Sequence, residues 1–191
     1  MENDIEKNKY QYIEQLEKFS TISPQGKFLI LVTYLGLKPV SEFQTHFINI
    51  SENEEKYRKV VEEMLDGLNL YHSYATEWDI EGNPFISFHF LISKEQNLLD
   101  NLKYFELDKQ ARDKTQGESF GFPKTAVDGY LNNDLLENYE SLITEEDKKF
   151  LFFRLSKKGW REEIEWLREM IKKIKEISPE IYLQVLNRDK K

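Results

Sequence analysis

The chain has 191 residues, a formal net charge of −8 and no cysteine, and 39% of its residues are hydrophobic. Its 13 Phe, 10 Tyr and 3 Trp can build a core, while the lack of cysteine excludes disulfide frameworks, zinc–thiolate sites and thiol nucleophiles. The negative net charge disfavours nonspecific nucleic-acid binding, because the average field of the protein would repel phosphates.

The N-terminus shows no basic segment followed by an apolar stretch, as a secretory signal would. The longest apolar run, 28–37, has about half the length that a membrane-spanning helix needs. We therefore expect a cytoplasmic protein that makes no membrane contact.

Helices are expected to open the chain. Apolar residues at helical spacing predict a helix over 5–19. The run 28–35 fits either a helix or a buried strand, because its Val, Ile and Tyr residues also prefer strands. Ser23 and Pro24 before the run and Gly36 after it favour a helix.

The central part of the chain predicts a sheet. Alternating residues indicate a strand over 42–49, and a capping box followed by helical spacing indicates a helix over 52–66. Two arms, 68–77 and 84–92, flank turn-forming residues and predict a hairpin. In the second arm, the residues expected to face the core are Ile86, Phe88, Phe90 and Ile92.

Helices dominate the remainder. A second capping box begins a helix at Ser93, and the polar stretch 107–121 predicts a loop or a short helix plus loop. Further helices are expected from Pro123, from Thr144 through about residue 155, over 160–177, and from Ser178 onward.

This order of elements predicts an α+β fold. Its small three-stranded, mostly antiparallel sheet has β-α-β-β order, with helices on one face and a helical C-terminal third. We expect one domain over 1–191, with a candidate seam at 106–143 before a helical part over 144–191.

All three histidines fall in expected strands: His46, His72 and His89. The predicted hairpin places His89 opposite His72 or Tyr74, where two imidazoles could bind a metal ion. Glu77 or Asp79 would be the third ligand. The alternative is that the histidines bond to backbone or water; the lack of a compact ligand spacing favours it, so no cofactor is expected.

Acidic residues surround the glycine-bearing segment in the middle of the second half: Asp108, Asp113, Glu118 and Asp128. Two carboxylates could perform general acid–base chemistry or hold Mg²⁺. A chain with 35 acidic residues forms such clusters by chance, so a solvated loop is the favoured alternative.

The segment 117–125 is unusual, because two glycines precede a helix N-terminus. Such a turn can direct backbone N–H groups at an anion. The candidate ligand or anion turn comprises Gly117, Gly121, Lys124 and Thr125. It lacks the Walker A spacing, and the favoured alternative is that Gly121 permits a tight turn and Pro123 begins the helix.

Residues 121–130, Gly-Phe-Pro-Lys-Thr-Ala-Val-Asp-Gly-Tyr, resemble the signature of an uncharacterised, largely archaeal family, Gly-Tyr-Pro-x-Cys-Cys-Val followed by an aromatic residue. The resemblance covers about residues 84–135 and implies a fold but no activity. The Cys-Cys pair is Thr125-Ala126 here, so any thiol or metal role of that pair is absent. An Asp and a Gly that the family carries upstream would correspond to Asp108 or Asp113 and to Gly117.

The predicted helix 160–177 carries a heptad-spaced apolar stripe comprising Trp160, Ile164, Leu167, Ile171 and Ile174. Such a stripe packs on its own domain or binds a second copy or another protein. The segment 154–191 holds 11 Lys or Arg against 7 Asp or Glu, a net +4.

We expect a non-catalytic intracellular binding or regulatory module. One alternative is a small metal-dependent hydrolase or transferase that acts on a phosphorylated substrate. The residues it would use are His72, His89, Asp113, Glu118, Lys124 and Thr125. A second alternative, nucleic-acid association, rests on the basic C-terminal helix and the aromatic residues near it.

Overall fold

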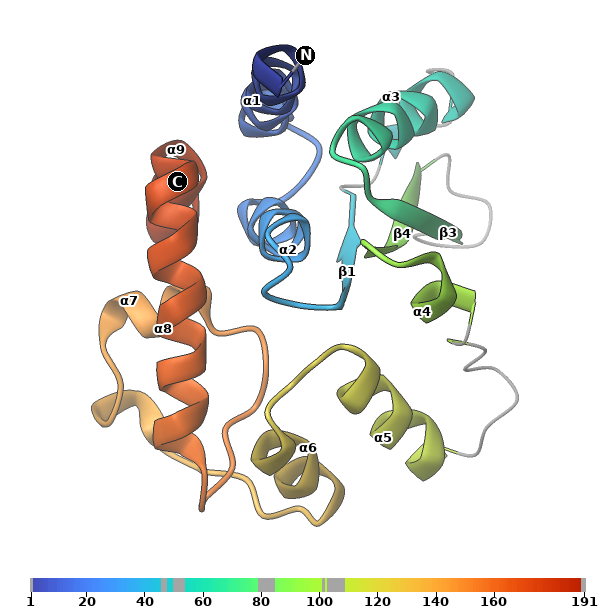
Figure 1. Cartoon of the computed structure of the whole chain (residues 1–191). Helices are drawn as coiled ribbons and strands as arrows, with labels where there is room; N and C mark the ends of the chain where they lie inside the picture. The colour runs from blue at the N-terminus through green and yellow to red at the C-terminus, as the bar shows by residue number, and fades with distance from the viewer. Residues whose placement is uncertain are drawn as a thin grey trace. The chain divides into compact units, whose positions relative to one another are not determined.

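The computed structural model describes residues 2–45, 48–49, 54–78, 85–100, 102 and 109–189. The chain divides into two compact units, residues 1–99 and 100–191 (Figure 1). The boundary lies before the seam that the sequence predicts at 106–143. The first unit holds the sheet and the second is helical, so the α+β class with a helical C-terminal part is confirmed.

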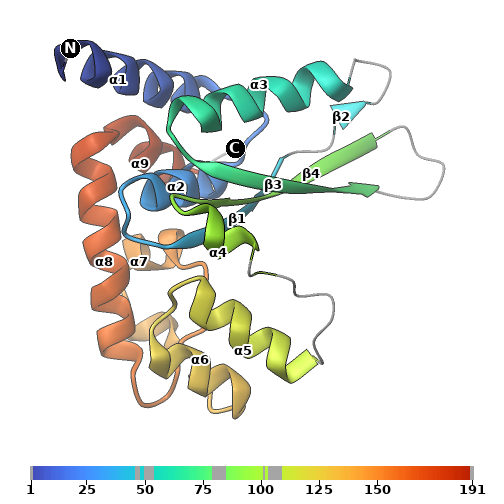
Figure 2. The same cartoon turned by 45° about the vertical axis from the view of Figure 1, so that its right-hand side comes forward.

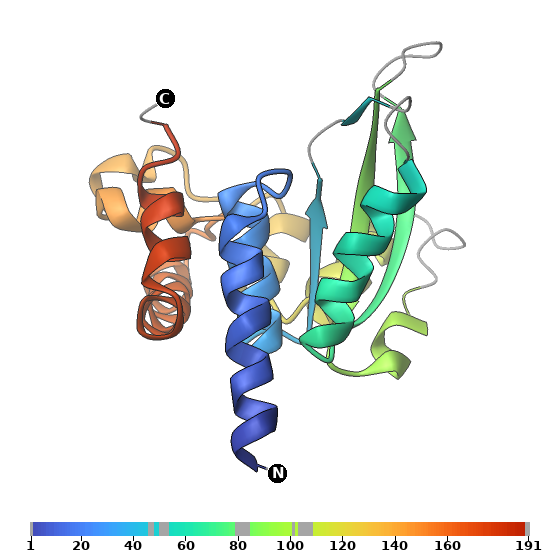
Figure 3. The ribbon, with the colours of Figure 1, turned by 90° about the horizontal axis from the view of Figure 1, so that it is seen from above.

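The sheet of the N-terminal unit is antiparallel throughout its described pairs. Its central strand is β4, with β3 along one edge and β1 and then β2 along the other, so it is three strands wide (Figure 3). The predicted strand 42–49 is therefore two short strands on one edge. The strands are β1 (Val40–Gln44), β2 (Ile48–Asn49), β3 (Tyr71–Trp78) and β4 (Phe85–Ser93).

The first three helices of this unit begin and end close to where the sequence places them, whereas the helix predicted from Ser93 through Phe105 ends at Asp100. The ambiguous run 28–35 is a helix: Ser23 Oγ accepts a hydrogen bond from Gly26 N at 3.0 Å, and Pro24 occupies the first turn. Gly36 follows the helix with a φ of +71°, which glycine adopts without strain. The helices are α1 (Glu2–Lys18), α2 (Pro24–Tyr34), α3 (Glu54–Gly67) and α4 (Gln96–Asp100).

One face of the sheet is covered by α2 and α3. Phe88, Phe90 and Ile92 are fully buried, as predicted, while the side chain of Ile86 lies outside the described residues. Tyr57 of α3 stacks on the Phe88 ring with centroids 6.2 Å apart. These contacts make β4 the centre of the core.

The helix α1 packs on α3, and the two run side by side in Figure 2. On α2, Thr33 Oγ1 donates to Ser41 Oγ of β1 at 2.7 Å. Because Ser41 pairs with Ile92, this bond lies on the face that α3 also covers. The N-terminal unit therefore has its helices on the predicted side of the sheet.

The C-terminal unit consists of short helices and one long helix. Those predicted from Pro123, from Thr144, over 160–177 and from Ser178 are present. The helix from Thr144 ends at Phe150, earlier than predicted, and the stretch 107–121 contains a helix. The elements are α5 (Lys109–Ser119), α6 (Lys124–Leu131), the 3₁₀ turn η3 (Tyr139–Ser141), α7 (Glu145–Phe150), α8 (Trp160–Ile177) and α9 (Pro179–Leu186).

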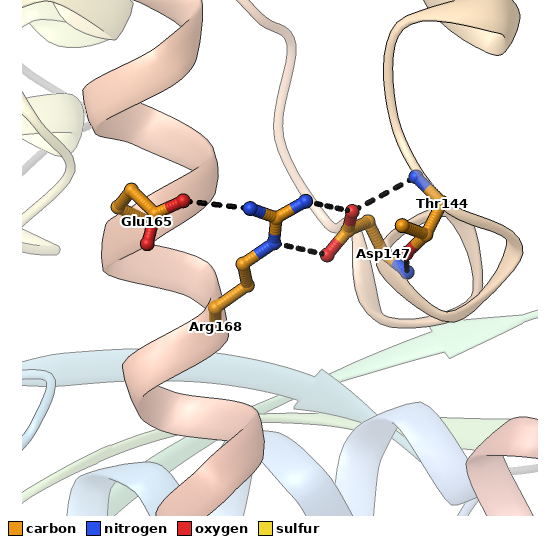
Figure 4. Close-up of polar contacts among 4 residues, drawn as sticks. All are labelled: Thr144, Asp147, Glu165 and Arg168. Atoms are coloured by element: carbon orange, nitrogen blue, oxygen red, sulfur yellow. Dashed lines mark hydrogen bonds and ion pairs between the residues drawn. The ribbon is translucent and has the colours of Figure 1, made fainter.

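An ion pair joins α7 to α8 (Figure 4). Arg168 donates through Nε and Nη2 to the two carboxylate oxygens of Asp147 at 3.0 and 2.9 Å. Thr144 Oγ1 accepts from Asp147 N, and the Asp147 carboxylate accepts from Thr144 N, which completes a capping box. Burial alone would raise the pKa of Asp147, but the hydrogen bonds from Arg168 and Thr144 outweigh it and lower that pKa.

Across the described parts of the chain, every helix is too short or too polar to span a lipid bilayer.

Candidate functional site

A cavity of about 260 Å³ opens in the C-terminal unit between α5, α6 and the segment 151–155. Ala126 and Val127 of α6 are buried in its wall. The cavity is lined by Asp113, Gln116, Gly117, Phe122, Ala126, Val127, Tyr130, Phe152, Phe153 and Arg154. Most of this surface is apolar, which suits a ligand or an apolar side chain.

Aromatic rings form one wall of the cavity. The Phe122 ring centroid lies 5.9 Å from that of Phe152, 5.8 Å from that of Phe153 and 6.4 Å from that of Trp166. Phe152 and Phe153 are 5.4 Å apart. These are the separations of rings in contact, so the cluster is a packed wall rather than a set of separate rings around an open centre.

Close helix packing forms another part of the cavity wall. A Cβ at Gly117 would lie 2.8 Å from Cγ2 of Val127, so α5 and α6 approach each other only because this residue has no side chain. A Cβ at Gly159 would lie 2.4 Å from the Thr125 Cβ. The position before α8 therefore also has no room for a side chain. The predicted candidate Gly117 therefore lines the cavity and also sets its shape.

The segment 151–155 leaves the helical path at Leu151, whose φ of −62° and ψ of 122° are extended. At its far end Glu163, which is fully buried, accepts hydrogen bonds from Ser156 N at 2.9 Å and Ser156 Oγ at 2.5 Å. Gly159 N in turn donates to Ser156 Oγ at 2.9 Å. Together with the Asp147 pair at α7, this bonding fixes both ends of the segment.

Two charged side chains of opposite sign line the cavity. Asp113 is half-buried on α5, and Arg154 is exposed on the segment 151–155. Within the described residues, neither side chain forms a hydrogen bond or an ion pair, and they do not pair with each other. Both charges are therefore available to a ligand in the cavity.

A second cavity of about 470 Å³ shares Phe152, Phe153 and Arg154 with the first. Its other cations are already engaged: Lys148 Nζ lies 2.5 Å from the Glu145 carboxylate, and Arg188 Nε lies 3.9 Å from that of Asp189. Arg154 is therefore the one cation lining this second cavity for which the described residues provide no partner.

The predicted anion turn is occupied by structural contacts. Gly121 has a φ of +68°, and the N–H groups of Gly121 and Phe122 donate to the carbonyls of Glu118 and Gly117 in α5. Lys124 Nζ lies 2.5 Å from the Asp128 carboxylate. These contacts favour the interpretation of a tight turn before α6 over that of an anion site.

The other residues that the sequence predicts as a site in this region do not lie together. Asp113 lines the cavity, whereas Glu118 is exposed and lies 3.9 Å from Lys114 Nζ. Thr125 packs against Gly159 and does not line the cavity. Asp108 lies outside the described residues.

The predicted pairing of the histidines is wrong. His89 lies opposite Ala75 and His72 opposite Ile92, so the register differs by one residue from the nearest one predicted. His72 therefore faces the helix-covered side and His89 the other side. His72 Nε2 lies 3.2 Å from the Asp66 carboxylate, and His89 Nδ1 lies 3.3 Å from that of Glu42.

Two histidines on opposite faces of a sheet cannot share one metal ion. No three His, Asp or Glu side chains in the described segments come together as a metal site would require. His46 and Asp79 lie outside those segments, and so does the side chain of Glu77.

The apolar stripe of α8 is largely buried in the chain. Four of its five members are at most 5% exposed, and Trp160 is half-buried. This burial favours the interpretation of a helix packed on its own domain over that of an interface. The four buried members are Ile164, Leu167, Ile171 and Ile174.

Comparison with known proteins found no matching family model, no similar curated protein and no similar solved structure. The function must therefore be argued from the cavity itself.

Proposed function

We propose that the C-terminal unit is a non-catalytic binding module whose cavity takes up the apolar part of a small ligand. The observation that carries the proposal is the apolar, aromatic wall beside two unpaired charges. Binding sites for small molecules are typically concave and mostly apolar, with a few polar groups that fix orientation. At about 260 Å³ the cavity lies just below the roughly 300–1,000 Å³ of sites for drug-sized molecules, so it suits a smaller compound.

The side chains that line the cavity support binding over catalysis. Asp113, Tyr130 and Arg154 are its titratable groups, and no Ser, Thr, His or Lys is among its described lining residues. An enzyme of the hydrolase or transferase class would place a nucleophile beside a base. The two described histidines belong to the other unit, where each lies beside a carboxylate.

A neutral probe tests this proposal without relying on charge. We expect 3-phenylpropanamide, titrated into the ¹⁵N-labelled full chain, to shift the amide resonances of Gly117, Val127 and Phe153. Ala126→Leu fills part of the cavity and is expected to weaken binding about tenfold or more, which corresponds to about 1.4 kcal/mol. Ala75→Leu, on the exposed part of β3, is the matched control and should leave binding unchanged.

Saturable shifts that spread from the cavity in the wild-type chain would support the proposal even if Ala126→Leu folds poorly. Shifts confined to other parts of the chain would contradict it, as would an affinity that a folded Ala126→Leu variant retains in full. Circular dichroism of each variant establishes that it is folded.

A further inference from the structure

Asp113 and Arg154 approach the same cavity from different elements, α5 and the segment after α7. One is an anion and the other a cation, and the described structure gives neither of them a partner. A ligand that satisfies both must carry a positive and a negative group beside its apolar part. The arrangement of charges therefore restricts the ligand class beyond what the apolar wall requires.

We infer that the cavity binds a free amino acid with a large apolar side chain; this inference rests on the proposed function. The guanidinium of Arg154 binds the ligand carboxylate, for which its planar pair of donors is suited. The carboxylate of Asp113 accepts hydrogen bonds from the ligand ammonium. The apolar side chain of the ligand packs against the wall of Phe122, Phe152 and Phe153.

Other ligand classes satisfy the cavity less well. A simple anion would lie near Asp113 and a simple cation near Arg154, and each arrangement adds repulsion between like charges. A neutral apolar molecule would contact the wall but gain no interaction with either charge. A residue inside a polypeptide has neither the free ammonium nor the free carboxylate, so a free amino acid fits better than an internal peptide segment.

The side chain of Gln116 adds a neutral polar group to the lining of the same cavity. It follows Asp113 by three residues on α5, and residues three apart share a helix face. An amide offers both a donor and an acceptor, so it can bond either end of a zwitterion. The polar groups that line the cavity thus match the two ends of an amino acid.

Four probes that share a phenylethyl part and differ in the charged groups attached to it test the inference. L-phenylalanine carries both charges, 3-phenylpropionate lacks the ammonium, phenethylamine lacks the carboxylate, and 3-phenylpropanamide lacks both. We expect L-phenylalanine to bind the wild-type chain about tenfold or more tightly than any of the others, which corresponds to about 1.4 kcal/mol. L-alanine, without a large side chain, should bind far more weakly than L-phenylalanine.

Two variants assign each charge to its partner. Asp113→Asn should abolish the preference for L-phenylalanine over 3-phenylpropionate and keep its preference over phenethylamine. Arg154→Gln should do the reverse. Glu118→Gln, on the same helix, and Arg161→Gln, whose guanidinium lies over the Trp160 ring, are matched controls and should leave both preferences unchanged.

The outcomes distinguish a failure of the amino-acid assignment from a failure of the proposed binding function. Equal affinity for 3-phenylpropanamide and L-phenylalanine at the cavity would overturn the amino-acid assignment and leave an apolar binding site. Equal losses for all four probes in both variants would also overturn it, because the charges would then act only on the fold. If no probe, including the neutral one, binds at the cavity, the proposed function itself fails.

Discussion

Lys38 places an amine in the core of the N-terminal unit, so the stability of this unit should depend on pH in a way that can be measured. It follows α2 in the turn toward β1, is only 2% exposed, and donates from Nζ to the Val40 carbonyl at 2.7 Å. Burial lowers the pKa of Lys38 from 10.5 to about 7. The unfolded chain therefore holds a proton at this site that the folded chain releases between about pH 7 and 10.5.

The sign of the effect follows from this difference in bound protons. Between those pH values the unfolded state binds more protons, so the free energy of unfolding rises with pH by about 1.4 kcal/mol per pH unit. From pH 7.5 to 9.5 the contribution of Lys38 is then about 3 kcal/mol. Below pH 7 the amine is protonated in both states, and the cost of burying its charge stays constant at about 5 kcal/mol.

The measurement is urea unfolding of wild type and Lys38→Met at several pH values. We expect the wild-type free energy of unfolding, minus that of the variant, to increase by about 3 kcal/mol from pH 7.5 to 9.5. Lys94→Met, at an exposed position, is the control and should give a flat difference, because water solvates that amine in both states. A flat difference for Lys38→Met would refute the argument from burial.

Three further substitutions test the packing around the cavity. Arg168→Leu removes the partner of buried Asp147 and should lower the free energy of unfolding by about 3 kcal/mol at pH 7. This loss should shrink as the pH falls below 3.8, because the pKa of Asp147 is lowered in the folded state and the ion pair stops stabilising the fold once the carboxylate is protonated. Urea unfolding of wild type and variant at pH 7 and at pH 3 measures the loss at each pH. Gly159→Ala should cost about 1–3 kcal/mol by crowding Thr125, with partial recovery in the double variant with Thr125→Gly measured by thermal unfolding. Phe122→Ala should cost about 3 kcal/mol in urea unfolding and abolish 3-phenylpropanamide shifts at the cavity; full retention of both stability and shifts would contradict the role of the aromatic wall.

Local rules predict those elements whose stabilising contacts lie within a few residues. Ser23 and Pro24 begin α2 as expected, and Thr144 caps α7 through a complete capping box. The alternation in β4 identifies its buried face because Phe88 and Phe90 pack on helices. In each case the residues that carry the signal also make the contacts.

The hairpin register is not predictable in the same way. Register is set where one face of a strand is buried, since a shift by one residue then exchanges the two faces. In β3, Tyr71, Ser73, Tyr74 and Ala75 are all exposed, so the strand has no clear alternation to align against β4. The metal-site hypothesis required His89 opposite His72, but the partner of His89 is Ala75, three residues further along β3.

The cavity wall was also missed from the sequence. The run from Phe150 to Leu155 is compatible with a continued helix, because it contains neither Gly nor Pro. The structure ends α7 at Phe150, so Phe152, Phe153 and Arg154 lie in an irregular segment outside any helix. Three consecutive apolar residues at 151–153 are a weak sign of such a segment in the sequence, since a surface helix would bury only one face.

Residues that do not line the cavity hold the segment 151–155 at both ends. Asp147, bonded to Arg168, lies before it, and buried Glu163, bonded to Ser156, lies after it. A segment held at both ends presents its side chains in a fixed arrangement, which lowers the entropic cost of binding. Arg168→Leu should therefore reduce stability and probe affinity together, whereas Asp113→Asn should change ligand preference alone. If Arg168→Leu leaves affinity intact in the folded protein, the shape of the cavity does not depend on the contact between α7 and α8.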